Sequence, residues 1–204
     1  KPGNEYRKPP PAIEEAPPRL TANRANWPDR LEDFAAWFLS DATLTDGGTA
    51  RRVPPRGPAR PDLMILVAEP EADDSARLLS GPHGRFLDNV LSAAGITQDR
   101  VYFASVLPRN TPLADWDELS RAGMAELTRH HIGLVSPERL LTFGRTVSSL
   151  LGNDPTQSQN FKLDINHSGG EISALACWDL AALLMRAKAR SGFWQRWLDW
   201  TVSK

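Results

Sequence analysis

Cysteine is almost absent from this 204-residue chain, and the shortage limits its chemistry. Cys177 is the only one, so the chain by itself cannot form an internal disulfide or supply four thiolates to a zinc or iron–sulfur site. Long apolar runs are missing too, because no stretch approaches 18 apolar residues and the first residues lack an apolar signal core. We therefore expect no membrane span, no secretory peptide, no metal or cofactor, and a location in the reducing cytoplasm.

An excess of charge of either sign is also lacking, with 24 Lys and Arg against 25 Asp and Glu. A nearly neutral chain is not drawn as a whole toward nucleic acid or an anionic membrane. Any contact with DNA must therefore be local and sensitive to salt.

Composition changes along the chain and indicates its organisation. Residues 1–25 begin with a proline-rich stretch that has few large apolar side chains and cannot bury enough surface to offset its ordering entropy. We predict a flexible arm there and one folded domain over residues 26–204. Inside that domain, residues 46–62 combine proline, glycine and arginine, which predicts a loop or a proline-stiffened bridge.

From Leu63 onward, apolar strands alternate with helical patterns. The predicted strands are 63–68, 101–106, 139–143 and 171–176; the predicted helices cover 84–95, 115–135, 145–152 and the segment ending in "FWQRWLDW", and 152–170 reads as a polar loop. Parallel strands need crossover helices, so the pattern predicts an α/β fold, a three-layer α/β/α sandwich around a mostly parallel four-stranded sheet. Ligands in such sheets bind at the carboxyl ends of the strands, which directs attention to residues 68–74, 105–112 and 177–185.

Four carboxylates, Glu69, Glu71, Asp73 and Asp74, directly follow the first predicted strand. Such a cluster can hold a hard metal ion or activate a water molecule. The same residues suit a solvated loop at the start of a helix, where acidic side chains interact favourably with the macrodipole. We favour the loop interpretation and keep the catalytic one open.

Polar side chains near the other strand ends are candidate contacts to nucleic acid. His83 lies in a glycine-flanked turn that opens a helix, where backbone N–H groups attract anions. Arg109 and Asn110, in "PRNTP", can reach a phosphate or a base edge, or simply belong to a connecting turn.

Two further groups read mainly as structural. His130 and His131 are adjacent late in a helix and face different directions, which does not suit a metal pair. Trp194, Trp197 and Trp200 share one helix face, and packing onto the sheet is a better interpretation than stacking on unpaired bases.

The segments "LMILVAEPEADD", "DRVYFASVLPRNTP" and "PERLLTFGRTVSSLLG" occur in an order that resembles the uracil-DNA glycosylase superfamily, most closely its iron–sulfur branch, family 4. The resemblance extends over residues 62–197. It implies the α/β/α sandwich described above, DNA as the ligand, a place in DNA repair or replication, and hydrolysis of the N-glycosidic bond to uracil.

The departures from that family lie in its catalytic motifs. "AEPEADD" keeps Glu69 but lacks the proline–glycine pair of the first motif, and the cluster cysteines are all missing. Ser105 stands where the family has the asparagine that reads the base edge, and Asp179 where it has a histidine. A carboxylate at that position would raise the barrier to base departure, and each lost donor costs about 3 to 4 kcal/mol. Ordinary uracil excision is therefore not expected.

Two hypotheses follow from this resemblance. The first is a degenerate, non-catalytic module that binds DNA, particularly single-stranded DNA, or a replication or repair protein through the arm or the C-terminal helix; the same fold serves in this way in a replicative polymerase accessory subunit. The second is an active glycosylase for uracil or another damaged base. There the catalytic residues would be Glu69, Asp73 and Asp74, and the DNA-binding residues His83, Arg85, Arg109 and Asn110. A metal-dependent phosphate-processing enzyme has only the carboxylate cluster in its favour.

Overall fold

The computed structural model describes residues 20–44, 47–152, 161–167 and 169–202. Most of the predicted arm, residues 1–19, and the centre of the predicted polar loop, residues 153–160, lie outside this range. The strands are β1 (Leu63–Val67), β2 (Val101–Ser105), β3 (Leu140–Phe143), β4 (Lys162–His167) and β5 (Gly170–Cys177). The helices are η1 (Leu20–Asn26), α1 (Leu31–Ser40), α2 (Pro82–Ala93), η2 (Gln98–Arg100), α3 (Trp116–Ala122), α4 (Met124–Val135), α5 (Arg145–Leu150), α6 (Leu180–Met185) and α7 (Ala187–Val202).

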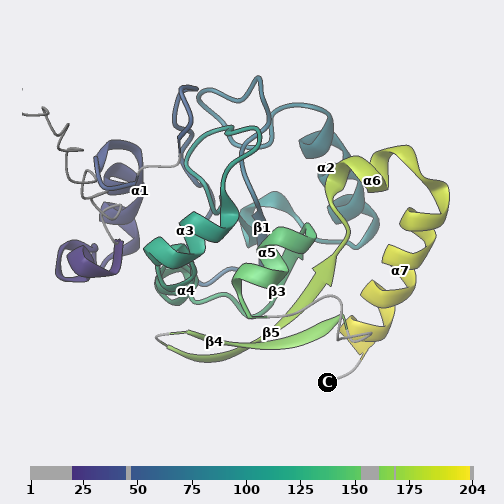
Figure 1. The fold of residues 1–204 in the computed structure, drawn as a ribbon. Helices are drawn as coiled ribbons and strands as arrows, with labels where there is room; N and C mark the ends of the chain where they lie inside the picture. The colour runs from purple at the N-terminus through teal and green to yellow at the C-terminus, as the bar shows by residue number, and fades with distance from the viewer. Residues whose placement is uncertain (1–19, 45–46, 153–160, 168, 203–204) are drawn as a thin grey trace, which may run out of the picture.

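One sheet runs through the centre of the molecule in the order β2-β1-β3-β5-β4 (Figure 1). Neighbouring strands are parallel except β4, which pairs antiparallel with β5. In register, Met64 of β1 lies beside Tyr102 on one side and Leu140 on the other. Every residue of β1, β2 and β3 is buried, as expected for parallel strands covered on both faces.

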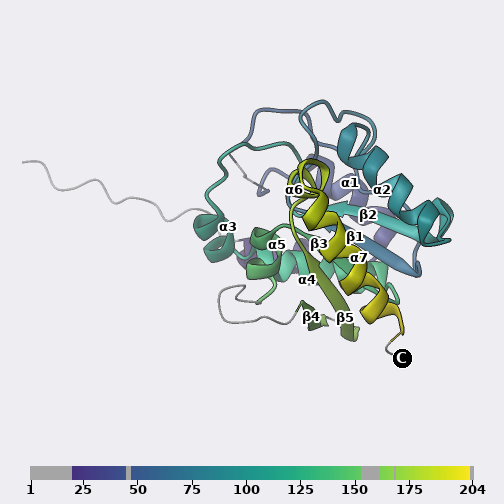
Figure 2. The same cartoon turned by 90° about the vertical axis from the view of Figure 1, so that its right-hand side faces the viewer.

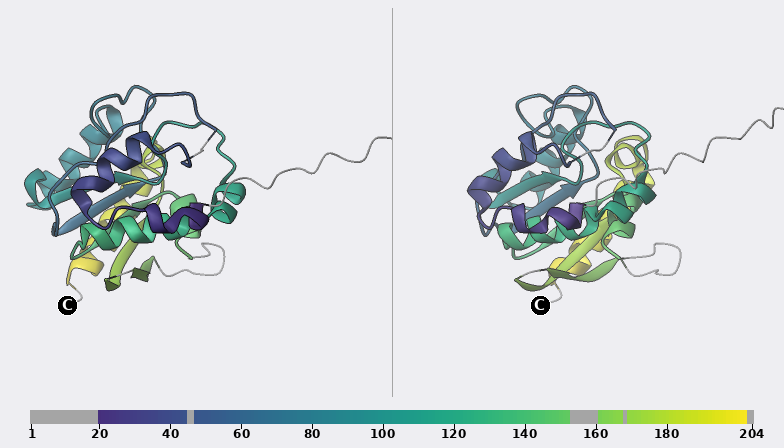
Figure 3. Two further views of the ribbon diagram at one scale, coloured as in Figure 1. Left: turned by 90° about the vertical axis from the view of Figure 1, so that its left-hand side faces the viewer. Right: turned by 60° about the vertical axis from the view of Figure 1, so that its left-hand side comes forward.

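Two apolar clusters cover the two faces of the sheet, and the period-two alternation of β1 divides its side chains between them. Met64 and Leu66 belong to the cluster that includes η1, α1, α3, α4 and α5, whereas Ile65 and Val67 face α2, α6 and α7. Figure 2 shows α7 lying across the second face, and Figure 3 shows η1 and α1 in purple on the first. This arrangement confirms the predicted α/β/α sandwich.

The fifth strand, β4, departs from the four-stranded sheet that the sequence predicts. It falls within the expected polar loop 152–170 and is paired only with β5. Its sequence is largely polar because it lies at the sheet edge, where Ile165 is its only buried residue. A strand of this kind gives too weak an apolar alternation to be separated from a loop.

Two predicted long helices are interrupted. The segment 115–135 divides into α3 and α4 at Gly123, whose φ of 104° is a left-handed conformation that favours glycine. The C-terminal segment divides into α6 and α7 at Arg186, which has extended φ and ψ angles. None of the described helices combines the length and the apolar character needed to cross a bilayer.

Both ends of the described domain pack against its core. Leu20, inside the predicted arm, is buried at the start of η1. In α7, Trp197 and Trp200 are buried and Trp194 packs against the same cluster, so these rings cover the sheet as expected.

Described residues 47–62 hold no helix or strand and pair once with β2, through a bridge between Arg56 and Phe103.

A polar pair is enclosed in the core between β2 and α4. The Tyr102 hydroxyl and His131 Nε2 are 3.1 Å apart, and the His131 ring stacks on Phe34 with ring centroids 4.1 Å apart. Burial, with a smaller contribution from His130, lowers the pKa of His131 to about 3. His131 is therefore a neutral core residue, in agreement with the structural interpretation of the histidine pair.

Candidate functional site

The carboxyl ends of the four parallel strands meet along one edge of the sheet. The chain leaves β1 at Ala68, β2 at Val106, β3 at Gly144 and β5 at Trp178. Backbone hydrogen bonds continue past the strands, because Leu107 N–H donates to the Ala68 carbonyl over 2.9 Å. Most of the residues selected from the sequence lie at this edge, and its chemistry depends on what their side chains bind.

Asp74 points into the protein. Its carboxylate accepts hydrogen bonds from the backbone N–H groups of Glu71 (2.9 Å), Leu79 (2.8 Å) and Ser80 (2.8 Å), and from the Ser80 hydroxyl (2.6 Å). Only 7% of the residue is exposed. Four donors fill the acceptor capacity of a carboxylate, so this side chain fixes the loop between β1 and α2.

Glu71 fills the anion position at the start of α2. Its carboxylate accepts from the backbone N–H groups of Gly81 (2.9 Å), His83 (3.0 Å) and Gly84 (3.4 Å). His83 Nδ1 lies 3.7 Å from the same carboxylate. The helix N-terminus that the sequence suggested for a phosphate is thus occupied by a side chain of the protein itself. Arg85 is exposed in the first turn of this helix.

Glu69 and Asn110 tie the first two strand ends together. The Glu69 carboxylate accepts from Thr111 N–H at 2.5 Å, and the Asn110 side-chain amide donates to the Pro70 carbonyl at 2.9 Å. Asp73 is the only exposed carboxylate of the four. The acidic cluster is therefore dispersed, and within the described residues no three His, Cys, Asp or Glu side chains converge to hold a metal ion.

Ser105 and Asp179, which the family resemblance aligns with its asparagine and its histidine, also form hydrogen bonds within the protein. The Ser105 hydroxyl donates to the Leu107 carbonyl over 2.7 Å and is almost fully buried. Asp179 accepts from Ala182 N–H over 2.7 Å and caps the N-terminus of α6. Neither side chain is arranged to read the edge of a base.

Arg109 borders an arginine pocket beside the acidic loop. The cavity measures about 550 Å³, and its lining is formed by Leu39, Arg51, Arg52, Pro54, Ser75, Ala76 and Arg109. Arg109 Nη1 donates to the Gly48 and Ala50 carbonyls at 3.0 and 3.3 Å, which anchors the proline- and arginine-rich segment. Arg51 is exposed at the rim. The pocket places positive charge next to the strand ends. The Arg109 guanidinium, however, is bonded to the backbone of the proline- and arginine-rich segment and holds that segment in place.

A second cavity at this edge was not predicted from the sequence. We call it the α6–α7 pocket; it measures about 320 Å³ and is lined by Trp178, Ala182, Arg186, Lys188, Ala189, Gly192 and Arg196. Trp178 follows β5 directly and is 43% exposed, a large value for an indole. Among the residues that the structure describes, three cations and no carboxylate line this cavity.

Burial affects Arg196 of the α6–α7 pocket and the nearby Cys177. Arg196 lies over the Phe161 ring at 3.3 Å, and burial lowers the pKa of its guanidinium, which still remains charged at neutral pH. Burial raises the pKa of the Cys177 thiol, so this group stays protonated and is not a nucleophile. A signal was available in the sequence: Trp178 comes two positions after the predicted strand 171–176, and the basic residues Arg186 and Lys188 follow in the next helical segment.

Comparison with known protein families places these features in context. The family model described as the uracil DNA glycosylase superfamily matches residues 54–201, from the proline-rich segment to the end of α7. The search of curated proteins found no match to the chain.

Proposed function

The chain belongs to the uracil DNA glycosylase superfamily, and from this membership we propose that it is a catalytically degenerate member that binds single-stranded DNA in DNA repair or replication. The proposed binding site is the α6–α7 pocket at the carboxyl edge of the sheet. The observation that carries the proposal is the exposed Trp178 surrounded by the cations of Arg186, Lys188 and Arg196.

The pocket chemistry fits unpaired nucleic acid. Single-stranded DNA is held by aromatic rings on which bases stack and by cations that follow its phosphates. Trp178 provides a ring of this kind, and Arg186 and Lys188 provide exposed charge within the same cavity. Because the whole chain carries a net charge of only −1, this local concentration of cations must supply most of the electrostatic attraction.

The hydrogen bonds of the candidate catalytic residues support the proposed loss of base excision. Excision requires an extruded base, donors to its edge and stabilisation of the departing anion. Ser105 donates within its own chain segment, and Asp179 places negative charge where a donor is needed. Asp74 is saturated by four donors and cannot position water without losing them.

A second candidate is a protein-binding module of replication or repair that uses the C-terminal helix. The observation in its favour is the outer side of α7, where Leu198 and Val202 are 53% and 81% exposed. The arm proposed as the other attachment point lies mostly outside the described residues.

Fluorescence anisotropy with a labelled single-stranded oligonucleotide tests the main proposal. We expect binding at low salt that weakens as salt is added, and a loss of about tenfold for Trp178→Ala, because one stacked base contributes roughly 1 to 3 kcal/mol. Leu198→Ala removes an exposed apolar side chain from the outer side of α7 and should leave the affinity unchanged. Arg186→Ala should reduce the salt dependence, whereas Arg121→Ala, an exposed cation on α3, should not.

Base release from the same oligonucleotide carrying one uracil separates the binding module from the enzyme. We expect no alkali-sensitive site after incubation with the protein. Release that disappears in Asp73→Asn or Glu69→Gln would instead establish an active glycosylase. Equal affinity of wild type and Trp178→Ala would remove the α6–α7 pocket from the binding site.

A further inference from the structure

One fully exposed leucine stands in the loop between β2 and α3. Leu113 has 103% of its surface accessible, so no other described residue covers its side chain. A single exposed leucine is ordinary on a protein surface. This one differs in the conformation of its backbone and in the charges around it.

The backbone presents the Leu113 side chain in a strained conformation. Ala114 N–H donates to the Thr111 carbonyl over 3.1 Å and closes a four-residue turn. Leu113 is third in this turn, after Pro112, and its φ is 63°. Turns with a positive φ at this position ordinarily use glycine or asparagine there. The turn thus carries an apolar side chain at a conformational cost, which is frequent where a side chain has a binding role.

Hydrogen bonds to the loop after β1 hold this turn in place. The Thr111 N–H donates to the Glu69 carboxylate, and the Asn110 side-chain amide donates to the Pro70 carbonyl over 2.9 Å. Thr111 itself is buried. Leu113 is therefore presented on a fixed base, so little conformational entropy is lost when it binds a partner.

Negative charge surrounds the base of this turn. Asp115, Asp117 and Glu118 follow Leu113 at the start of α3, and all three are exposed. Among the described residues none of these carboxylates belongs to an ion pair, and Arg121 is the one basic residue in α3. We call Leu113 and the three acidic residues the acidic tip. Because phosphates repel carboxylates, the acidic tip suits a cationic protein surface and not DNA.

The α6–α7 pocket has the complementary character. Its lining combines the Trp178 indole with small residues such as Ala182 and Ala189, and Arg186 and Lys188 add exposed cations. The cavity of about 320 Å³ is larger than one leucine side chain. An apolar side chain with carboxylates around it therefore matches this pocket in size, polarity and charge.

We propose that the chain forms a dimer in which the acidic tip of each copy occupies the α6–α7 pocket of the other. The tip follows β2 and the pocket follows β5, so both lie beyond the carboxyl ends of parallel strands, with β1 and β3 between them. A two-fold axis between tip and pocket brings the two contacts into one closed interface. A consequence that rests on the proposed function is that the dimer covers Trp178, so self-association and binding of single-stranded DNA exclude each other.

Sedimentation velocity of the full chain over a range of concentrations tests the dimer. Wild type should change from monomer to dimer as its concentration rises. Leu113→Gly removes the apolar side chain and relieves the strained φ, so it should melt no lower than wild type but dimerise at least about tenfold more weakly. Leu198→Ala is the matched control, because it truncates an exposed leucine on α7, and it should dimerise like wild type.

Charge reversal tests the pairing of tip and pocket. Asp117→Lys and Lys188→Glu should each weaken self-association, because each places like charges together in both contacts. In a mixture of the two variants, one contact holds the reversed pair and the other the native pair. The mixed dimer should therefore form with an affinity near that of wild type, and melting curves of each variant check its folding.

A chain that stays monomeric at every concentration would overturn the proposal, as would wild-type dimerisation of Leu113→Gly or no recovery in the mixture. Leu113→Gly should bind the labelled oligonucleotide at least as well as wild type. Weaker binding by this variant would assign the acidic tip to DNA and refute the dimer. Sedimentation is measured without DNA, so its result does not depend on whether the proposed function holds.

Discussion

The buried His131 makes the stability of the protein depend on pH in a way that can be calculated. The ring is 3% exposed, and burial lowers its pKa from 6.5 to about 3. Between these two values the unfolded chain binds a proton at this position and the folded chain does not. Protons therefore favour unfolding, and the stability is complete above pH 6.5 and falls as the pH decreases below it.

The size of the effect follows from the pKa difference. Each pH unit below 6.5 costs about 1.4 kcal/mol, so at pH 5 the contribution of His131 lowers the free energy of unfolding by about 2 kcal/mol. This figure depends little on the folded pKa as long as that value lies well below 5. For a domain with a total stability of roughly 5 to 15 kcal/mol, a loss of this size is readily measured.

His131→Gln isolates this contribution, because glutamine can still bond to the Tyr102 hydroxyl but does not titrate. Urea unfolding of both proteins at pH 7.5, 6 and 5 gives their free energies of unfolding. Wild type should lose about 2 kcal/mol more than the variant between pH 7.5 and 5. Burial also lowers the pKa of His167, but this group is present in both proteins and cancels in the comparison. Equal losses in the two proteins would refute the reasoning.

Two further pairs of substitutions test the loop between β1 and α2 and its contact with that helix. Asp74→Asn should lower the free energy of unfolding by about 2 to 3 kcal/mol, because an amide keeps one acceptor oxygen and turns its NH2 group toward the donors of the other. The exposed Asp73→Asn should stay within about 0.5 kcal/mol. Urea unfolding measures both, and equal effects would mean that the loop does not depend on Asp74. Gly84→Ala should cost at least about 2 kcal/mol, because its Cβ would lie 1.8 Å from the Leu79 carbonyl oxygen. Gly192→Ala, with no atom within 4 Å of the added Cβ, should stabilise α7 by about 0.5 to 1 kcal/mol, and thermal melting that ranks the pair otherwise would contradict the packing at Gly84.

The parallel core of the fold could be predicted because its strands are buried on both faces. β1 is apolar at every position, and turn or helix signals bound it on either side, so its assignment needs only the sequence. β4 could not be predicted, since its pairing with β5 depends on a hairpin register that its polar residues do not specify. Likewise, Leu20 follows a proline-rich stretch, and nothing local shows that η1 packs against the core.

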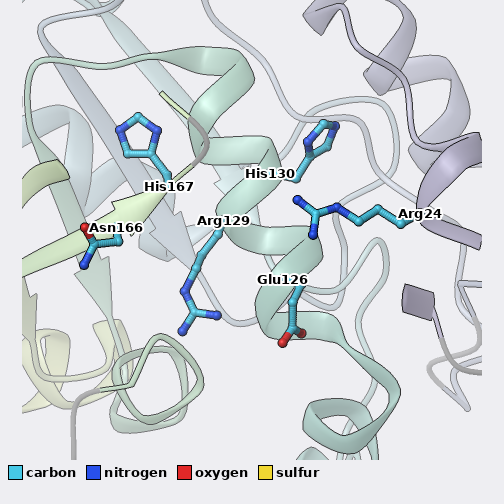
Figure 4. Close-up of a pocket in the computed structure, with 6 residues that line it drawn as sticks. All are labelled: Arg24, Glu126, Arg129, His130, Asn166 and His167. Carbon is cyan, nitrogen blue, oxygen red and sulfur yellow. The ribbon is translucent and has the colours of Figure 1, made fainter. Parts of the chain in front are cut away.

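The sequence predicts which segments lie at the carboxyl ends of the strands, but not what their side chains bind. Parallel strands predicted that residues 68–74, 105–112 and 177–185 follow strand ends at one edge, and the observed order places the strands before them side by side in one sheet. Sequence patterns do not show which way a side chain points, and the inward orientation of Asp74 became clear only from its four hydrogen bonds. Arg24 and His167 line one cavity although most of the chain separates them in sequence, a juxtaposition that requires the tertiary fold (Figure 4).

The bridge between Arg56 and Phe103 also bears on how the protein avoids aggregation. β2 is an outer strand whose residues are all buried and mostly apolar, and an uncovered strand of this kind is a template for another chain. Arg56 exchanges two backbone hydrogen bonds with Phe103, and its guanidinium lies 3.8 Å from the Phe103 ring. The opposite edge, β4, relies on exposed Lys162 and Asp164 instead. The proline- and arginine-rich segment thus covers the outer edge of β2. Shortening this segment should expose the unpaired backbone groups of that edge and favour pairing with a second copy of the chain.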